Sequence, residues 1–196
     1  MLEKTLGIAI KNIHYKESSS IVSVYTESFG LKSYIIKGGR KRNATVHSSL
    51  FQPLQVLDLV VYENPKNSLQ SIKECSLALE QNSIYTNIIK TSLAYFLQEV
   101  ICLSLKENAS DKDIFNFLHS SVIKLNTCED KSLKDFHLHF LYDFATLLGF
   151  KPYDISLISE NKQERLDKLS LLINFYQENI TDNRPILSHQ ILHTIL

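Results

Sequence analysis

The chain has 196 residues, of which 44% are apolar, and its 21 Lys and Arg balance its 21 Asp and Glu. This length accommodates one domain of ordinary size or two small ones. No apolar run reaches the roughly 18 residues that span a bilayer, and residues 1–6 lack the apolar stretch of a signal peptide, so we expect a cytoplasmic protein without a membrane segment.

The first 80 residues predict five short β-strands. They are expected at residues 7–13, 20–26, 31–37, 54–62 and 69–77, because these runs are rich in β-branched and aromatic side chains. Gly30 is expected to close a hairpin turn with a positive φ, and Pro53 fits the start of the fourth strand. Five short strands in succession favour a small closed barrel, and an OB-fold is the leading candidate.

From about residue 82 the apolar side chains recur at helical spacing. Helices are expected at residues 82–105, from 111 or 113 to 125, 132–149, 163–178 and 190–196. Ser132 is expected to open the third helix through a capping box, and Gly149 to end it. The predicted fold class is therefore α+β, with a five-stranded OB-fold barrel over residues 1–80 and an all-helical domain over residues 81–196.

Positive charge is concentrated near the N-terminus. Residues 1–42 carry eight Lys and Arg against three Glu, a net charge of +5, whereas residues 81–196 carry 11 Lys and Arg against 14 Asp and Glu, a net charge of −3. A basic N-terminal part beside a mildly acidic body indicates that any polyanion binds to the N-terminal part.

A basic loop at residues 37–42, Lys-Gly-Gly-Arg-Lys-Arg, is the candidate nucleic-acid site. The glycines allow close backbone approach, and the cations suit phosphates. The expected phosphate contacts are Lys37, Arg40, Lys41 and Arg42, with Lys11, Lys16 and Lys32 as lesser contributors. Tyr15 or Tyr34 is expected to stack a base, although either ring also fits a barrel core. A solvated turn that binds nothing is the alternative.

The sequence offers no metal site and no catalytic cluster. Its three cysteines are widely spaced and form no C-x-x-C motif. His137 and His139 stand two apart on a predicted helix and point in different directions, whereas His189 and His193 can share a face but have no third ligand nearby. We therefore expect no metal and no cofactor, and the absence of a nucleophile or carboxylate motif argues against an enzyme.

Four motifs occur in the order typical of one family. They are Tyr15-Lys-Glu-Ser18, Tyr25-Thr-Glu-Ser-Phe-Gly30, Lys37-Gly-Gly-Arg40 and Gln52-Pro53. In this order they resemble the N-terminal domain of the bacterial RecO family. Residues 147–152 resemble the helix end that precedes a four-cysteine zinc module in many members. Residues 153–159 contain no cysteine, so we expect no zinc here, as in shorter forms of the family.

The resemblance implies a non-enzymatic recombination mediator in DNA repair. Members of the family bind single- and double-stranded DNA, anneal complementary strands and associate with RecR. They also help RecA replace single-strand-binding protein (SSB), whose acidic C-terminal tail binds the helical domain, so a nucleoid-associated cytoplasmic location is implied. Two alternatives stay open, which are an interaction adaptor whose barrel binds a peptide and not DNA, and a small enzyme of unknown type.

Overall fold

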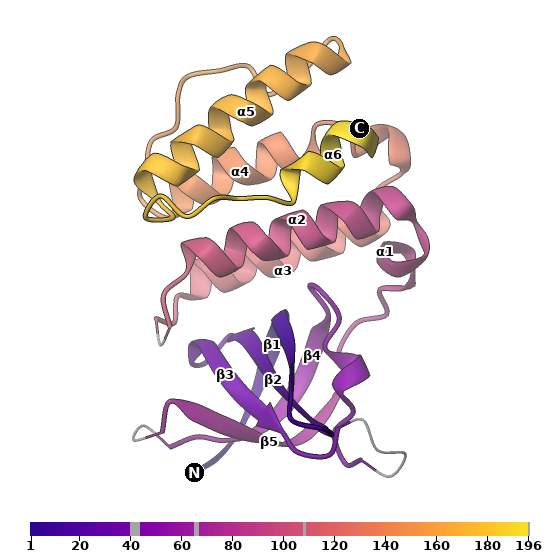
Figure 1. The fold of residues 1–196 in the computed structure, drawn as a ribbon, viewed down its shortest axis with the longest axis vertical. Helices are drawn as coiled ribbons and strands as arrows, with labels where there is room; N and C mark the ends of the chain where they lie inside the picture. The colour runs from indigo at the N-terminus through magenta and orange to yellow at the C-terminus, as the bar shows by residue number, and fades with distance from the viewer. Residues whose placement is uncertain (40–43, 65–66, 108, 196) are drawn as a thin grey trace. The chain divides into compact units, whose positions relative to one another are not determined.

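The computed structural model describes residues 1–39, 44–64, 67–107 and 109–195 (Figure 1). The chain divides into two compact units. The first unit comprises Met1–Gln81 and Leu105–Phe115, and the second comprises Asn82–Ser104 and Asn116–Leu196. Among the described residues, no helix has both the length and the apolar character that a membrane crossing requires.

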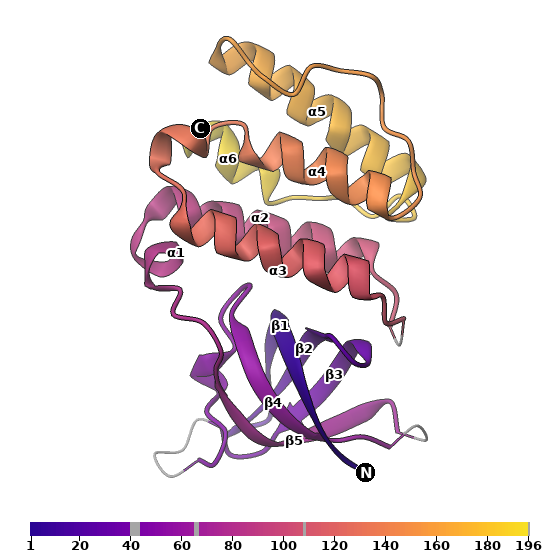
Figure 2. The ribbon, with the colours of Figure 1, turned by 180° about the vertical axis from the view of Figure 1, so that it is seen from behind.

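The first unit is a closed five-stranded β-barrel (Figure 2). Its strands are neighbours in the order β1-β2-β3-β5-β4, and β4 pairs back with β1. Among the strand pairs in the described part of the chain, only β3 and β5 run parallel. The bounds are β1 (Leu2–Tyr15), β2 (Ser19–Thr26), β3 (Gly30–Ile36), β4 (Val56–Tyr62) and β5 (Leu69–Leu77). This topology confirms the predicted OB-fold and, together with the helices that follow, the α+β class.

Alternating side chains of the strands build the barrel core. In β4, Leu57, Leu59 and Val61 are buried whereas Asp58 and Tyr62 are exposed, as the two-residue period of a strand requires. The core also includes residues of the loop between β3 and β4. Its buried members are Ala9, Val22, Val24, Tyr34, Ile36, Val46, Phe51, Leu57, Leu59 and Val61.

Residues 105–115 group with the barrel, although the sequence placed them in the helical domain. The hydroxyl of the buried Tyr25 donates to the Asp111 carbonyl and accepts from the Asp111 N–H, both at 3.3 Å. The Tyr25 and Phe115 rings stack with centroids 6.4 Å apart. Gly30 has the predicted positive φ of 66°, and a Cβ there would lie 2.1 Å from the Ala109 carbonyl oxygen.

The predicted fourth strand begins later than expected. Leu54 has a φ of 62°, and the Gln55 N–H donates to the Gln52 carbonyl at 3.0 Å. Pro53 and Leu54 are therefore the central residues of a turn in which a positive φ follows proline, as in type II turns. The strand starts after this turn, at Val56.

The second unit is helical. The structure contains α1 (Asn82–Thr86), α2 (Ile88–Ser104), α3 (Lys112–Thr127), α4 (Phe136–Leu147), α5 (Lys162–Asn179) and α6 (His189–Ile195), with 3₁₀ turns η1 (Ser48–Leu50) and η2 (Asp130–Ser132). α3 begins in the first unit and continues into the second.

The prediction of a single helix over residues 82–105 is wrong, because Asn87 interrupts it. The Asn87 side chain accepts from the N–H groups of Ile89 and Lys90 and caps α2.

The predicted capping box at Ser132 is also wrong. Ser132 lies in η2, and α4 begins at Phe136. The Asp135 carboxylate does not cap the helix but pairs with Arg165, whose Nε lies 3.1 Å from Oδ1. The predicted end is confirmed at Gly149, which has a φ of 87°. The N–H groups of Gly149 and Phe150 bond back into the last turn in a Schellman pattern.

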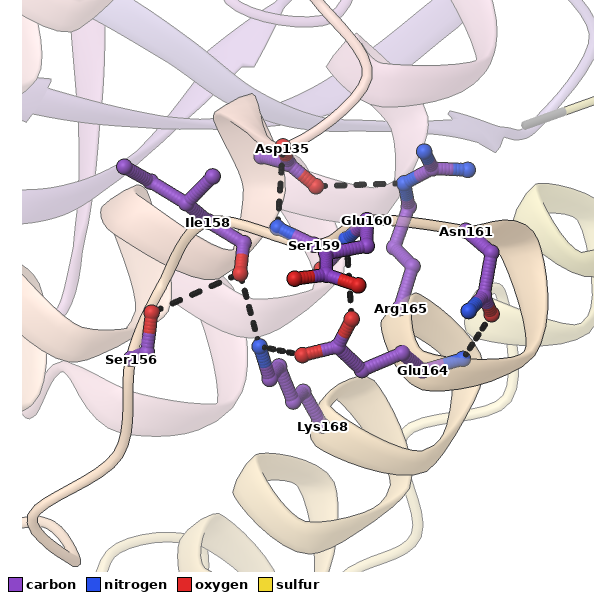
Figure 3. A network of polar contacts seen from close by, with 9 residues as sticks. All are labelled: Asp135, Ser156, Ile158, Ser159, Glu160, Asn161, Glu164, Arg165 and Lys168. Carbon is purple, nitrogen blue, oxygen red and sulfur yellow. Dashed lines mark hydrogen bonds and ion pairs between the residues drawn. The ribbon is translucent and has the colours of Figure 1, made fainter.

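The segment between α4 and α5 is tied down by polar contacts (Figure 3). The Ser159 N–H donates to Asp135 Oδ2 at 3.4 Å. Lys168 Nζ donates to the Ile158 carbonyl at 2.7 Å and also to the Glu164 carboxylate. Asn161 caps α5 by accepting from the Glu164 N–H. The cysteine-free residues 153–159 are thus held at Ile158 and Ser159 by hydrogen bonds between their backbone and charged side chains.

Candidate nucleic-acid interface

The predicted basic loop follows β3 directly. Lys37 is exposed, and Gly38 adopts a φ of 67°, a conformation that glycine adopts without steric cost. Arg40, Lys41 and Arg42 lie outside the described residues. Of the four main phosphate contacts that the sequence predicts, the structure therefore places Lys37, at the end of β3 and facing solvent.

Lys11, Tyr15 and Lys16 lie along the second half of β1 and in the turn after it. Lys11 follows a β-bulge at Ile10, since Ala9 pairs with Val24 and Lys11 with Ser23. All three side chains are exposed, with Tyr15 at 40%. Lys16 Nζ lies 5.3 Å from the centroid of the Tyr15 ring, a cation–π distance. A base that stacks on that face of the ring would displace this ammonium group.

Lys32 is already engaged. Its Nζ lies 2.9 Å from Glu63 Oε1, and the exposed fractions of the two side chains are 13% and 12%. A phosphate would have to displace this largely buried carboxylate from Lys32. The ion pair therefore makes Lys32 the least available of the predicted contacts.

Tyr34 cannot stack a base in this fold. Its side chain is fully buried in the barrel core. Burial, together with the nearby Glu63 carboxylate, raises the pKa of the Tyr34 hydroxyl far above its ordinary value. The prediction that Tyr34 stacks a base is wrong, because alternation along β3 turns its ring inward, and Tyr15 is the remaining predicted platform.

Sequence reasoning missed Tyr62 and Lys73, which line the same surface cleft as Lys37. Tyr62 ends β4 and is 49% exposed. The alternation of β4 provided a signal, because it places Asp58 and Tyr62 on the outer side of the strand. No sequence pattern marks Lys73, which becomes an extra residue opposite β4 through a bulge between the pairs Val60↔Glu74 and Val61↔Ile72.

The histidine pairs behave differently from each other. His137 is buried and His139 is exposed, as expected for residues two apart on a helix. Burial lowers the pKa of His137 to about 3, with a smaller contribution from the Arg165 charge. The His189 and His193 rings lie 5.5 Å apart on α6. Within the described part of the chain, no group of three or more His, Cys, Asp and Glu side chains is arranged to hold a metal.

The sequence of the barrel is similar to that of known proteins. Residues 1–79 match the family model described as "Recombination protein O N terminal". The "DNA repair protein RecO" of Bacteroides fragilis is 36% identical over 152 residues, which cover 78% of this chain and 62% of that protein. Residues 1–79 therefore match the RecO N-terminal family, and the chain is similar to RecO proteins over 78% of its length.

Other RecO proteins match over a similar extent. That of Azobacteroides pseudotrichonymphae is 38% identical over 152 residues, 78% of this chain and 63% of the relative. That of Flavobacterium johnsoniae is 33% identical over 156 residues, 79% of this chain and 65% of the relative. The chain spans less than two thirds of the length of these relatives. The four motifs between Tyr15 and Pro53 all lie inside the segment that matches the RecO N-terminal model.

Proposed function

We propose that this RecO-like protein binds DNA through its barrel and acts in DNA repair as a non-enzymatic recombination mediator. The observation that carries the proposal is the set of exposed cations on the barrel, Lys11, Lys16 and Lys37. Three more cations follow Lys37 within five positions of the sequence, at Arg40, Lys41 and Arg42. The names of the relatives, "DNA repair protein RecO", support the same function.

The proposed mechanism is non-covalent. Cations that neutralise phosphates release condensed counterions, so binding is strong at low salt and independent of sequence. Contacts of this kind fix the register of the strand and leave the base edges free. A strand held by its backbone on residues 1–80 keeps its bases available for pairing, which suits both single- and double-stranded DNA and the annealing of complementary strands.

Similarity to RecO proteins suggests further steps. We propose that RecR is a partner, that the helical domain (81–196) takes the acidic C-terminal tail of SSB, and that the protein helps RecA replace SSB on single-stranded DNA. A protein that acts on bacterial DNA works in the cytoplasm, at the nucleoid. Support for these steps comes from the relatives and from the mediator role that the RecO resemblance implies.

The decisive experiment measures fluorescence anisotropy of a labelled single-stranded oligonucleotide at about 50 and 200 mM salt, a range over which several phosphate contacts cost orders of magnitude in affinity. The parent is compared with the variant Arg40→Ala/Lys41→Ala/Arg42→Ala. We expect the variant to lose affinity to a similar extent for all DNA sequences. The slope of its affinity against salt concentration should fall by up to about one unit for each lost phosphate contact.

Each outcome is informative. An unchanged salt slope in the triple variant would remove residues 40–42 from the site and leave Lys11, Lys16 and Lys37 as the cations to test. Failure of the parent to bind DNA at low salt would overturn the proposed function and favour a barrel that binds a peptide.

A further inference from the structure

A cleft with a volume of about 560 Å³ lies on the barrel between the end of β3 and the first half of β5. Its described lining includes Lys37 from the end of β3, Tyr62 from the end of β4 and Lys73 from β5. Clefts of this size commonly hold small-molecule ligands, so the space is sufficient for one nucleotide.

The strand pairing explains why a cleft forms here. β3 and β5 lie side by side (Figure 1), but their parallel register consists of the pairs Ser33↔Leu69, Tyr34↔Gln70 and Ile35↔Ser71. Beyond this register the two strands are no longer paired. On its other edge, β5 carries the bulge at Lys73, and bulges often redirect a side chain next to a functional site.

The charge of this cleft differs from that of a second cleft on the same barrel. The second cleft, of about 650 Å³, is lined by Lys4 and by the carboxylates of Asp58 and Glu74. The described lining of the cleft beside Tyr62 contains Lys37 and Lys73 and no carboxylate. An anionic ligand is therefore attracted to the cleft beside Tyr62 and repelled by the other.

Lys73 is available to a ligand. Its Nζ lies 3.3 Å from Glu74 Oε1, but the two side chains are 44% and 62% exposed. Ion pairs in this environment contribute little because water screens them and both side chains lose freedom. A phosphate group can therefore compete with Glu74 for Lys73 more easily than with Glu63 for the largely buried Lys32.

Tyr62 supplies the aromatic surface. It is 49% exposed, in contrast to the fully buried Tyr25 and Tyr34. Its backbone is held between β1 and β5 by the pairs Leu2↔Tyr62 and Tyr62↔Ser71, so the ring stands on a fixed scaffold. Aromatic rings beside cations are the usual platforms for single strands, since every base offers a π-face.

We propose that this cleft holds one unpaired nucleotide of single-stranded DNA, with its base on Tyr62 and its flanking phosphates on Lys37 and Lys73. The inference rests on the proposed DNA-binding function and makes it more specific. A base can lie on Tyr62 only when it is not paired, so the cleft favours single strands over duplex. Double-stranded DNA contacts the exposed cations of the barrel without using Tyr62.

The protein contains no tryptophan, which allows a direct test. The variant Tyr62→Trp carries one indole at the cleft, and we expect an oligothymidine strand to quench its fluorescence in parallel with the anisotropy change. The control is Tyr95→Trp, at a tyrosine of α2 that is 52% exposed, and its fluorescence should not follow binding. A duplex of the same length should leave the Tyr62→Trp signal nearly unchanged.

Affinity measurements add a second readout. Tyr62→Ala should weaken single-strand binding by roughly 5- to 150-fold, the range that stacking of one base on an aromatic ring contributes, and should leave duplex binding nearly unchanged. Tyr62→Phe retains the ring and should bind like the parent. Lys73→Ala should lower the salt slope by about one unit, whereas Lys4→Ala, at the cleft with two carboxylates, should not.

The outcomes separate the two proposals. If the parent binds DNA with a steep salt slope but Tyr62→Ala binds equally well and Tyr62→Trp is not quenched, the nucleotide cleft is overturned and the DNA-binding function stands. If the parent does not bind at low salt, both fall. Thermal unfolding of each variant shows whether a loss of binding comes from a loss of fold. If Tyr62→Ala is unfolded, the binding of Tyr62→Phe and the quenching of Tyr62→Trp test the proposed cleft.

Discussion

The two units differ in where they keep their cations. In the helical unit, Lys90 and Arg165 are 4% and 7% exposed. Lys90 Nζ donates to the Ser83 hydroxyl at 2.7 Å and to the Asn126 carbonyl at 2.9 Å, and Arg165 pairs with Asp135. In the barrel, Lys11 and Lys37 face solvent. Lys90 and Arg165 therefore stabilise the helical unit from inside, whereas Lys11 and Lys37 on the barrel remain available for a ligand.

The strongest test of this contrast removes the buried ion pair. Arg165→Ala leaves the Asp135 carboxylate with 13% exposure and no cation, and breaking a buried pair in this way typically costs about 3–5 kcal/mol of unfolding free energy. Urea denaturation followed by circular dichroism measures it. Lys162→Ala, at an exposed position of the same helix, is the control and should change stability by about 0.5 kcal/mol or less.

The paired variant Arg165→Met/Asp135→Leu sharpens this result. Because replacing both members of a buried pair by apolar residues is often neutral, the double variant should recover most of the stability lost in Arg165→Ala. A loss below about 1 kcal/mol in Arg165→Ala itself, the range of exposed ion pairs, would show that water screens this pair and that the contrast between the units is wrong.

The buried histidine predicts how the helical unit responds to pH. The pKa of His137 is lowered in the folded state from 6.5 to about 3. The unfolded chain therefore binds a proton below about pH 6.5 that the folded chain does not bind. His137 therefore makes its full contribution to the free energy of unfolding above pH 6.5. As the pH falls towards 3, this contribution is lost, by about 1–2 kcal/mol between pH 7 and pH 5.

Denaturation at pH 5, 6 and 7 measures this dependence. His137→Phe removes the titrating group and should flatten the profile, whereas His139→Gln changes an exposed histidine and should keep the profile of the parent. Equal pH dependence in the parent and in His137→Phe would show that His137 has the same pKa in the folded and unfolded chains, contrary to its burial beside Phe96, Arg165 and Asp135.

Much of the fold could be predicted from sequence because local patterns determine it. The alternating strands and the positive φ at Gly30 and Gly149 were recognisable in this way. The errors arose where a side chain had two uses. Asp135 fits a capping box, but it pairs with Arg165, 30 positions away, and no local pattern contains that partner. The sequence around Tyr34 fits a base-stacking ring as well as a core ring, and only the closed barrel shows that the ring is buried.

The candidate site was predictable only in part for the same reason. Residue type alone identifies Lys37 as a cation beside a glycine pair, and this signal is local. The cleft depends instead on the parallel pairing of β3 with β5, which joins residues 36 positions apart, and on the bulge that adds Lys73. The proposed role of Tyr62 in base stacking can be inferred only from these long-range pairings.

A smaller effect is expected where the barrel binds residues 105–115. Tyr25→Phe removes the hydroxyl that contacts the Asp111 backbone and should cost about 0.5–1.5 kcal/mol, the net value of a hydrogen bond. Hydrogen exchange should locate the change at residues 109–115, and Tyr15→Phe, at an exposed ring, is the control. Unaltered exchange at these residues would mean that the Tyr25–Phe115 ring contact alone holds the segment.

The smallest change in stability should come from the ligand-facing cations. Lys37→Ala should alter the unfolding free energy by about 0.5 kcal/mol or less because its side chain is exposed, and it should still lower the salt slope of DNA binding by about one unit. Lys32→Ala is the matched contrast, since it leaves the Glu63 carboxylate, which is 12% exposed, without its cation and should cost about 3–5 kcal/mol, as for the Arg165 pair. If Lys37→Ala destabilised the barrel as much as Lys32→Ala, Lys37 would be a structural cation. The barrel would then show no distinction between a cation that stabilises the fold, Lys32, and a cation that is free to bind DNA, Lys37.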